Sequence, residues 1–412
     1  MRIAVWHNLP SGGGKRALHD QVRGLLERGH AVEVWSPATA DRDYMPLGGM
    51  VKEHVLPLRW REPGARDGAA EKVRWALGTP HRNLRALEEH CLRCAEMIDG
   101  GRFDLLLAHS GSVVAVAPIG RLVRIPRILY LQEPLRILYE AMPAWPWIPP
   151  RLPAGSWLRP ELLVAHLGQR VRLRYFEALA REEAASIRAY DAVLANSLFS
   201  RESMLRAYGV DARPCYLGVD TKVFTDHRVA RKDDLVGVGS FTPSKNIEFA
   251  IRAVSHLRAP RPRLLWMGNA AEPSYLAELV RLAAELGVDF DPRQMVSDAE
   301  LVDALNRAAA MVYAPRLEPF GYAPLEANAC GLPVVAVAEG GVRETVVDGV
   351  NGILVDSDER AMARAIERLR DDPGLARTIG QAGRQVVEER WSLGAAADRL
   401  ERRIDEVLRG RG

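Results

Sequence analysis

The sequence predicts an α/β protein built from two doubly wound parallel sheets. Short apolar runs alternate with helical patterns along the 412 residues, which is the order of elements in such sheets. The chain is also too long for one ordinary core, so two domains of roughly 200 residues are expected. We place the first domain at 1–217, the second at 218–390, and a terminal helix at 391–412 that packs back across the domain junction.

Composition narrows the class of protein. The chain is 48% hydrophobic and 26% charged, and its net charge of +3 gives no bulk support for a nucleic-acid partner. The N-terminus, MRIAVWHNLP, lacks the features of a signal peptide, and no run of about 18 apolar residues occurs. Cys91 and Cys94 form a C-x-x-C inside a helical pattern, with no second pair to complete a zinc site. We expect a cytoplasmic protein without a metal.

The first half opens with a strand-loop-helix-strand unit. RIAVWHN is a short apolar strand, SGGG is a glycine loop, and KRALHDQVRGLLERGH is helical with Leu18, Val22 and Leu25 on one face. Gly29 closes that helix, and AVEVWSP reads as the next strand. Further strands of the same half are FDLLLAHS, PRILYLQ and DAVLANS.

Residues 134–175 interrupt this alternation. The first part is dense in Pro and Trp, and the second part is helical and rich in Arg. One interpretation is a structured connection followed by a solvated basic helix. The other is peripheral contact with the inner face of a membrane through 140–175, with Trp145, Trp147 and Trp157 as interfacial anchors.

The second half repeats the α/β pattern. Its predicted strands are LVGVGSF, RLLWMGN, VDFDP, AAAMVYAPR and PVVAVAE, with helices between them such as EFAIRAVSHL, YLAELVRLAAELG and DAELVDALNRAA. Ligands of such sheets bind beyond the carboxyl ends of the strands, so we expect both halves to face a central cleft.

The segment EPFGYAPLEANACGLPVVAV indicates the ligand. Pro324 fits the first turn of a helix, and Gly331 fits the position just past its end. The N–H groups of 321–323 would then lie at a helix N-terminus, which favours a phosphate. Glu318 and Glu326 flank this point, and carboxylates repel phosphates but accept hydrogen bonds from sugar hydroxyls. The combination suits a nucleotide-sugar.

The same segment, EPFGYAPLEA, resembles the E-x7-E motif of the family 4 retaining glycosyltransferases, which have the two-domain GT-B fold. The stretches SGGGKRAL, NSLFSRESMLRAYGV, YLGVDTKVF, VGSFTPSKN and AVAEGGVRETVVDGVNGILVD are similar to that family in the same order. The resemblance covers nearly the whole chain and is densest from 190 to 356. It implies a GT-B protein of two Rossmann-like domains.

The resemblance also implies roles for individual residues. Glu326 would bind the nucleotide ribose, Glu318 would face the donor sugar, and Lys245 would neutralise the diphosphate of the departing nucleotide. The implied donor-binding set is Gly13, Gly14, Ser240, Lys245, Gly268, Met295, Val296, Glu318, Phe320, Gly321, Tyr322, Ala323 and Glu326. The implied acceptor side comprises Gln132, Glu133, Gly340 and Gly341.

Two positions depart from the family pattern. Relatives commonly carry Arg where this chain has Ser240, so only Lys245 remains of that Arg–Lys pair unless another arginine, such as Arg316 or Arg343, substitutes. Many relatives carry His where this chain has Gln132, which cannot act as a base. His109 is either a group in the cleft or a buried histidine at a strand end. The candidate catalytic residues are therefore Lys245, Glu318 and His109.

The function implied is retaining hexosyl transfer from a nucleotide-diphosphate sugar to a glycan or lipid-linked saccharide, as in polysaccharide biosynthesis. Such enzymes need neither a protein nucleophile nor a metal or other cofactor, because the donor phosphate can take the acceptor proton. Three alternatives stay open: a transferase for a soluble small molecule, a degenerate protein that binds a nucleotide-sugar without turnover, and a two-sheet sugar-nucleotide epimerase.

Overall fold

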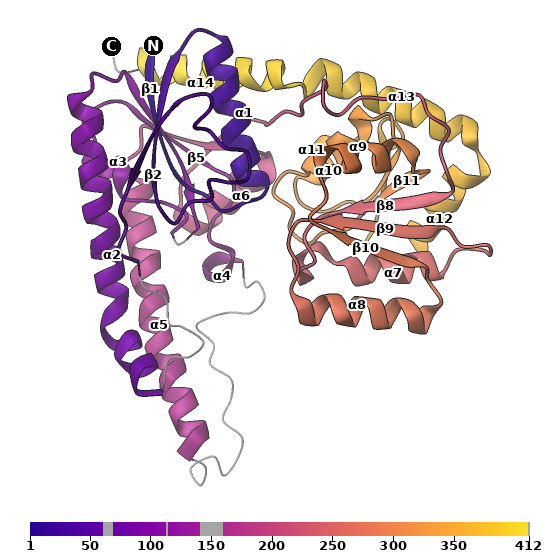
Figure 1. Ribbon diagram of the computed structural model, residues 1–412, viewed down its shortest axis with the longest axis horizontal. Coiled ribbons are helices and arrows are strands. Elements are labelled where there is room, and N and C mark those ends of the chain that lie inside the picture. The colour runs from indigo at the N-terminus through magenta and orange to yellow at the C-terminus, as the bar shows by residue number, and fades with distance from the viewer. Residues whose placement is uncertain (61–68, 113, 141–159, 411–412) are drawn as a thin grey trace. The chain divides into compact units, whose positions relative to one another are not determined.

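The computed structural model describes residues 1–60, 69–112, 114–140 and 160–410, with side chains described outside 61–81, 113, 141–172 and 411–412. The chain forms two compact units (Figure 1). The first unit comprises Met1–Asn196, Ser200–Cys215 and Leu400–Gly412, and the second comprises Ser197–Phe199 and Tyr216–Arg399.

The first unit is built on a seven-stranded parallel sheet in the order β3-β2-β1-β4-β5-β6-β7. Its strands are β1 (Arg2–Asn8), β2 (Ala31–Pro37), β3 (Lys52–Leu56), β4 (Leu105–Gly111), β5 (Arg127–Leu131), β6 (Ala192–Ala195) and β7 (Arg213–Pro214). Five of these follow the predicted apolar runs. The short edge strands β3 and β7 were not predicted, because KEHVL and RP carry few apolar residues.

Helices cover both faces of this sheet, and α1 and α2 lie on opposite faces (Figure 1). The helices are α1 (Gly13–Glu27), α2 (Ala69–Gly100), α3 (Ile119–Leu122), α4 (Arg136–Tyr139), α5 (Pro160–Ile187) and α6 (Leu198–Tyr208). The predicted helix in the second part of 134–175 is confirmed as α5. Trp145, Trp147 and Trp157 lie outside the described residues.

The predicted C-x-x-C lies within α2, as its helical pattern indicates. Cys91 and Cys94 are both buried in the core between α2 and the sheet. Burial raises the pKa of both thiols, that of Cys94 to about 12. These thiols are therefore protonated at neutral pH and act as small apolar core side chains.

The second unit is built on a six-stranded parallel sheet in the order β10-β9-β8-β11-β12-β13. Its strands are β8 (Asp234–Val238), β9 (Arg263–Gly268), β10 (Phe290–Gln294), β11 (Ala310–Tyr313), β12 (Val334–Val337) and β13 (Gly352–Val355). Five of these strands match the predicted apolar runs, and the sixth, the edge strand β13, was not predicted.

The helices of the second unit fill the connections between its strands. They are η2 (Pro243–Lys245, a 3₁₀ turn), α7 (Ile247–Ser255), α8 (Pro273–Leu286), α9 (Asp298–Arg307), α10 (Tyr322–Ala329), α11 (Val342–Thr345), α12 (Glu359–Asp371) and α13 (Pro373–Arg390). The last helix, α14 (Leu393–Arg409), is divided between the two units after Arg399. Across the described ranges, none of the helices is long and apolar enough to cross a membrane.

Both sheets follow the strand order of a doubly wound Rossmann-like domain, so the predicted fold class is confirmed. In each sheet the order reverses between two central neighbours, β1 and β4 in the first unit and β8 and β11 in the second. Connections leave this point toward opposite faces, which opens a crevice at the carboxyl ends of the strands. These two switch points carry most of the residues that the sequence singled out.

Candidate functional site

The switch point of the second unit is formed by two loops, one after β8 and one after β11. The loops are tied together where they pass each other. The backbone N–H of Arg316 donates to Ser244 O at 2.9 Å, and Asn246 Nδ2 donates to Ala314 O at 3.0 Å. These hydrogen bonds fix the position of one loop relative to the other, so side chains of the two loops can contact each other.

An ion pair joins two of the predicted residues across these loops. Lys245 Nζ lies 2.7 Å from Glu318 Oε2, and the two side chains are 25% and 14% exposed. They are separated by 73 positions in the chain, so no local pattern indicates the contact. The ion pair thus places an ammonium group and a carboxylate next to each other, and both remain partly accessible to solvent.

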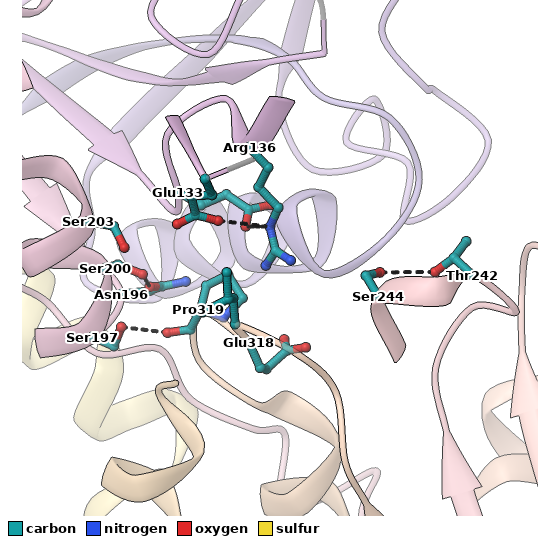
Figure 2. A network of polar contacts seen from close by, with 12 residues as sticks. Glu133, Arg136, Asn196, Ser197, Ser200, Ser203, Thr242, Ser244, Glu318 and Pro319 are labelled. Atoms are coloured by element: carbon teal, nitrogen blue, oxygen red, sulfur yellow. Dashed lines mark hydrogen bonds and ion pairs between the residues drawn. The ribbon is translucent and has the colours of Figure 1, made fainter. Parts of the chain in front are cut away.

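The loop after β8 approaches β9 very closely. A Cβ on Gly268 would lie 2.3 Å from the carbonyl oxygen of Gly239, which leaves room for glycine alone. Ser240 begins a chain of hydroxyls: its Oγ lies 3.2 Å from Thr242 Oγ1, which lies 3.1 Å from Ser244 Oγ (the second contact is drawn in Figure 2). Ser240 therefore contributes a neutral polar group beside Lys245.

The helix predicted from Pro324 and Gly331 is confirmed as α10. Gly321 stands at its N-cap with a φ of 95°, and Gly331 follows its end with a φ of 66°, both in the left-handed region. Pro324 occupies the first turn, where its missing N–H costs nothing. The dipole of a helix favours an anion at its N-terminus, and α10 begins four residues after Glu318.

Glu326 lies within α10 and is only 4% exposed. Buried hydrogen bonds between two asparagines fix α10 in place. Asn328 Nδ2 donates to Asn351 O at 2.9 Å, and Asn351 Nδ2 donates to Asn328 Oδ1 at 2.9 Å. This network fixes the rotation of α10 and with it the position of Glu326. Its two asparagines were not predicted, since nothing in the sequence pairs them.

Gly340 and Gly341 pack directly against the loop that carries Glu318. A Cβ on Gly340 would lie 2.4 Å from Glu318 O, and one on Gly341 would lie 2.3 Å from Pro319 O. The Gly341 N–H donates to Glu318 O at 2.7 Å, and the Glu339 carboxylate accepts from Leu317 N at 2.6 Å. These residues therefore position Glu318, a role that the sequence did not indicate for Glu339.

The same loop is fixed on its other side by the short segment 197–199 of the second unit. Ser197 Oγ donates to Pro319 O at 2.5 Å (Figure 2). The Phe320 side chain is 2% exposed and contacts the rings of Tyr322 and Trp391, at centroid distances of 5.3 and 5.7 Å. Because that ring is part of the core, Phe320 can contribute to a ligand site only through its backbone. Ala323 is likewise buried, at 7%.

Met295 and Val296 follow β10 at the edge of the same switch point. The Met295 N–H donates to Gly268 O at 3.1 Å, which connects this turn to the end of β9. The Met295 side chain is 77% exposed, an unusual state for a large apolar group. Met295 thus offers an apolar surface beside Gly268.

Gly13, Gly14 and Gln132 come together at the switch point of the first unit. The two glycines are the first residues of α1. Gln132, just after β5, donates weakly from Nε2 to Gly14 O at 3.4 Å, and a Cβ on Gly14 would lie 3.3 Å from that nitrogen. Its neighbour Glu133 forms an ion pair with Arg136 of α4 at 2.5 Å, visible in Figure 2.

His109 is the buried strand-end histidine of the two alternatives. It lies in β4, is 1% exposed and stacks on Tyr130 with ring centroids 5.5 Å apart. Burial, and then the nearby charge of Lys15, lower the pKa of His109 to about 3. The ring is therefore neutral under working conditions. Its neighbours His7 and Lys15, both fully buried, were not predicted as site residues.

Two family models match the chain along most of its length. "Glycosyltransferase Family 4" matches residues 11–223 and "Glycosyl transferases group 1" matches residues 221–386. Together with the two Rossmann-like sheets, these matches define the class as glycosyltransferases of the GT-B fold. The chain belongs to glycosyltransferase family 4, as its motifs predicted.

Curated relatives and solved structures agree with this assignment. The chain is 32% identical to a D-inositol 3-phosphate glycosyltransferase of Stackebrandtia nassauensis, over 95% of this chain and 88% of that protein. It is 24% identical to the human alpha-1,3/1,6-mannosyltransferase ALG2, over 97% and 94%. Sucrose-phosphate synthase from Thermosynechococcus elongatus shares the fold with a TM-score of 0.71, at 19% identity and full coverage of both chains. HepE from Anabaena, in complex with UDP, shares it with a TM-score of 0.69, at 20% identity and coverage of 98% and 100%.

Proposed function

We propose that this glycosyltransferase is retaining and metal-independent, and that it moves a hexosyl group from a nucleotide-diphosphate sugar to a glycan or lipid-linked saccharide. The observation that carries the proposal is the Lys245–Glu318 pair, 2.7 Å apart and immediately before the N-terminus of α10. A cation and a helix N-terminus favour a diphosphate, and carboxylates accept hydrogen bonds from sugar hydroxyls.

The donor would be held by both glutamates. Glu318 would accept from hydroxyls of the sugar, and Glu326 from hydroxyls of the ribose. Lys245 would then divide its three donors between Glu318 and the diphosphate. The exposed Met295 side chain beside Gly268 offers an apolar surface for the base. The UDP in the solved structure of HepE, which shares this fold, supports a nucleoside diphosphate as the ligand class.

The proposed transfer needs no nucleophile from the protein. The bond between the anomeric carbon and the diphosphate oxygen breaks, and the acceptor oxygen bonds to that carbon on the same face. The acceptor proton passes to the departing phosphate oxygen. Lys245 and the first turn of α10 would stabilise the negative charge that grows on the diphosphate. Because these groups supply the positive charge, the scheme needs no metal or other cofactor.

A second candidate acceptor is a soluble small molecule. The relative with 32% identity is named for D-inositol 3-phosphate, which favours this class. Co-sedimentation with liposomes separates the two acceptor classes, since a lipid-linked acceptor requires contact with a membrane surface. Of the segment proposed for that contact, 140–175, residues 141–159 lie outside the described residues and 160–175 belong to α5.

Thermal unfolding in the presence of UDP, GDP, ADP and their common sugars tests the donor site. A ligand at a hundred times its Kd should stabilise the protein by about 2.7 kcal/mol. Glu326→Gln and Lys245→Met should each weaken binding of the active nucleotide by tenfold or more, because a hydrogen bond to a charged group contributes about 1.5–3 kcal/mol. Lys232→Met, which removes an exposed lysine of the same unit, is the matched control.

Absence of stabilisation by every nucleotide would refute the proposed donor class. The stereochemistry is read separately, from the anomeric coupling constant of the product in an NMR spectrum. Retention requires that the donor and the product share one anomeric configuration. Activity that is lost in EDTA and restored by a divalent cation would contradict the metal-independent scheme.

A further inference from the structure

The first unit contains a group of buried nitrogen atoms that the proposed donor chemistry does not use. His7, Lys15 and His109 are 0%, 0% and 1% exposed. Their His7 Nε2, Lys15 Nζ and both His109 ring nitrogens have no hydrogen-bond partner within the described part of the chain. Nearly all buried polar atoms in folded proteins are paired, so such a group indicates a partner that is absent.

Three elements bring these side chains together at the switch point. In the register of β1 and β4, Trp6 lies opposite Ala108, and both pack into the core on the α2 side of the sheet. Side chains alternate along a strand, so His7 points to the opposite face, and so does His109, which lies opposite Tyr130 of β5 and stacks on its ring. Helix α1 lies on that face of the sheet (Figure 1). Lys15 is the third residue of α1.

The charge of Lys15 acts on both histidines, in agreement with this placement. Burial, and then the charge of Lys15, lower the pKa of both His7 and His109. Burial also lowers the pKa of Lys15 itself, while Glu53 and Asp41 raise it and Arg42 lowers it further. The two acids therefore favour the charged ammonium without forming an ion pair with it.

The free atoms of this group include at least two hydrogen-bond donors. The Leu9 N–H donates to His7 Nδ1 at 3.3 Å, so a neutral His7 ring carries its proton on Nε2, the atom without a partner. The Lys15 ammonium has no acceptor capacity. Lys15 lies in the first turn of α1, where the helix dipole adds positive potential. A compact anion with several oxygens matches this arrangement.

We propose that His7, Lys15 and His109 form a binding site for a phosphate group, and that this phosphate belongs to the acceptor substrate. The assignment to the acceptor rests on the proposed function, because the donor diphosphate is there assigned to the second unit. The site itself follows from the first unit alone. The phosphate bound here could instead come from the diphosphate of the donor, and the experiment below distinguishes the two sources.

The approach to this site is covered by the connection between β2 and β3. Asp41 N–H donates to Leu9 O at 2.9 Å, and Arg16 Nε donates to Tyr44 Oη at 3.2 Å. Ligand entry therefore requires this connection to shift. Ala40, Leu47 and Val51 anchor the two ends of this connection in the core, so only the part from Asp41 to Tyr44 would move, and its hydrogen bonds can be exchanged for bonds to water.

The test measures inorganic phosphate binding to the full chain by titration calorimetry, with sodium chloride at equal ionic strength in the reference. All proteins carry Lys245→Met, so that the second unit contributes little. Lys15→Met and His7→Phe should each raise the Kd for phosphate by tenfold or more. Lys52→Met removes a lysine of the same unit whose side chain is 70% exposed, and it should leave the Kd within twofold.

Equal phosphate affinity in Lys15→Met, His7→Phe and the Lys52→Met control would overturn the site. That result would leave the proposed function intact, since nucleotide binding by the second unit is measured separately. The source is decided with native Lys245 and the active nucleoside diphosphate. If Lys15→Met leaves the nucleotide Kd within twofold, the phosphate belongs to the acceptor. A tenfold loss of nucleotide affinity would overturn the assignment to the acceptor.

Discussion

Glu183 is a buried carboxyl group whose ionisation should make the stability of the first unit depend on pH. It lies in α5 with no exposed surface. Its Oε1 accepts from the Ala115 N–H at 2.6 Å, and its Oε2 accepts from Tyr208 Oη at 3.0 Å. Burial raises its pKa to about 7 despite these hydrogen bonds, from an ordinary value of 4.5.

The sign and size of the change in the free energy of unfolding follow from the linkage between proton binding and folding. The folded state binds this proton more tightly than the unfolded state, so its contribution to stability is complete below pH 4.5 and is lost as the pH rises to about 7. A difference of about 2.5 pKa units corresponds to about 3 kcal/mol. Gln stays neutral at every pH, so Glu183→Gln should remove this dependence.

Thermal unfolding from pH 4.5 to pH 8.5 provides the assay. Any constant cost of the substitution cancels, because the relevant quantity is the change in the difference between variant and wild type. That difference should shift in favour of Glu183→Gln by about 3 kcal/mol, or about 6–12 °C in the Tm of a unit of this size. Glu182→Gln, which removes the neighbouring carboxylate that pairs with Arg121 at 2.7 Å, controls for the loss of one charge.

Parallel curves for Glu183→Gln and wild type across this range would refute the reasoning. They would mean that the hydrogen bonds to the carboxylate fully offset the cost of its burial, so that the pKa of Glu183 is the same in the folded and unfolded states. The result also matters for the acceptor side, since Glu183 holds the backbone that follows β4 and thus the surroundings of His109.

Two further substitutions test how the site of the second unit is held. Gly340→Ala should lower kcat/KM by at least tenfold and should also lower the Tm, because a Cβ would lie 2.4 Å from Glu318 O at a φ of 62°; steady-state kinetics that match wild type would contradict this role. Gly380→Ala should lower the free energy of unfolding by about 1–3 kcal/mol without a specific loss of activity, because its Cβ would lie 2.1 Å from Gly331 O where α13 crosses the end of α10. Chemical denaturation measures that loss, and an unchanged midpoint would show that α13 moves away without cost.

Local chemistry explains why α10 was predictable. Pro324 and Gly331 each have one favourable place in a helix, and the structure puts both there. The strands were predictable because each buried parallel strand is a continuous apolar run. The edge strands β3 and β7 lack such runs, and their pairing depends on neighbours that are distant in the sequence. The GILV of β13 is an apolar run as long as β11 and β12, so the prediction missed a signal that the sequence carries.

Contacts between distant segments were beyond prediction for the same reason. The Lys245–Glu318 pair spans 73 positions, and Asn328 meets Asn351 only because α10 packs beside the turn before β13. His7 and Lys15 gave a weaker but usable signal. A lysine directly after a glycine loop, at a helical position that faces the sheet, must be buried, and a buried lysine needs an explanation.

The two switch points share one strand order but differ in their chemistry. In the second unit Lys245 is paired with Glu318, and Glu326 adds a second carboxylate, so this point offers hydrogen-bond acceptors for hydroxyl groups as well as a cation. In the first unit the buried groups are Lys15 and two histidines, and neither nearby acid forms an ion pair with the lysine. A ligand with hydroxyls around a diphosphate fits the former, and a bare phosphate group fits the latter. On these two proposals, two copies of one topology would bind two different substrates, because side chains at the strand ends and not the strand order determine what is recognised.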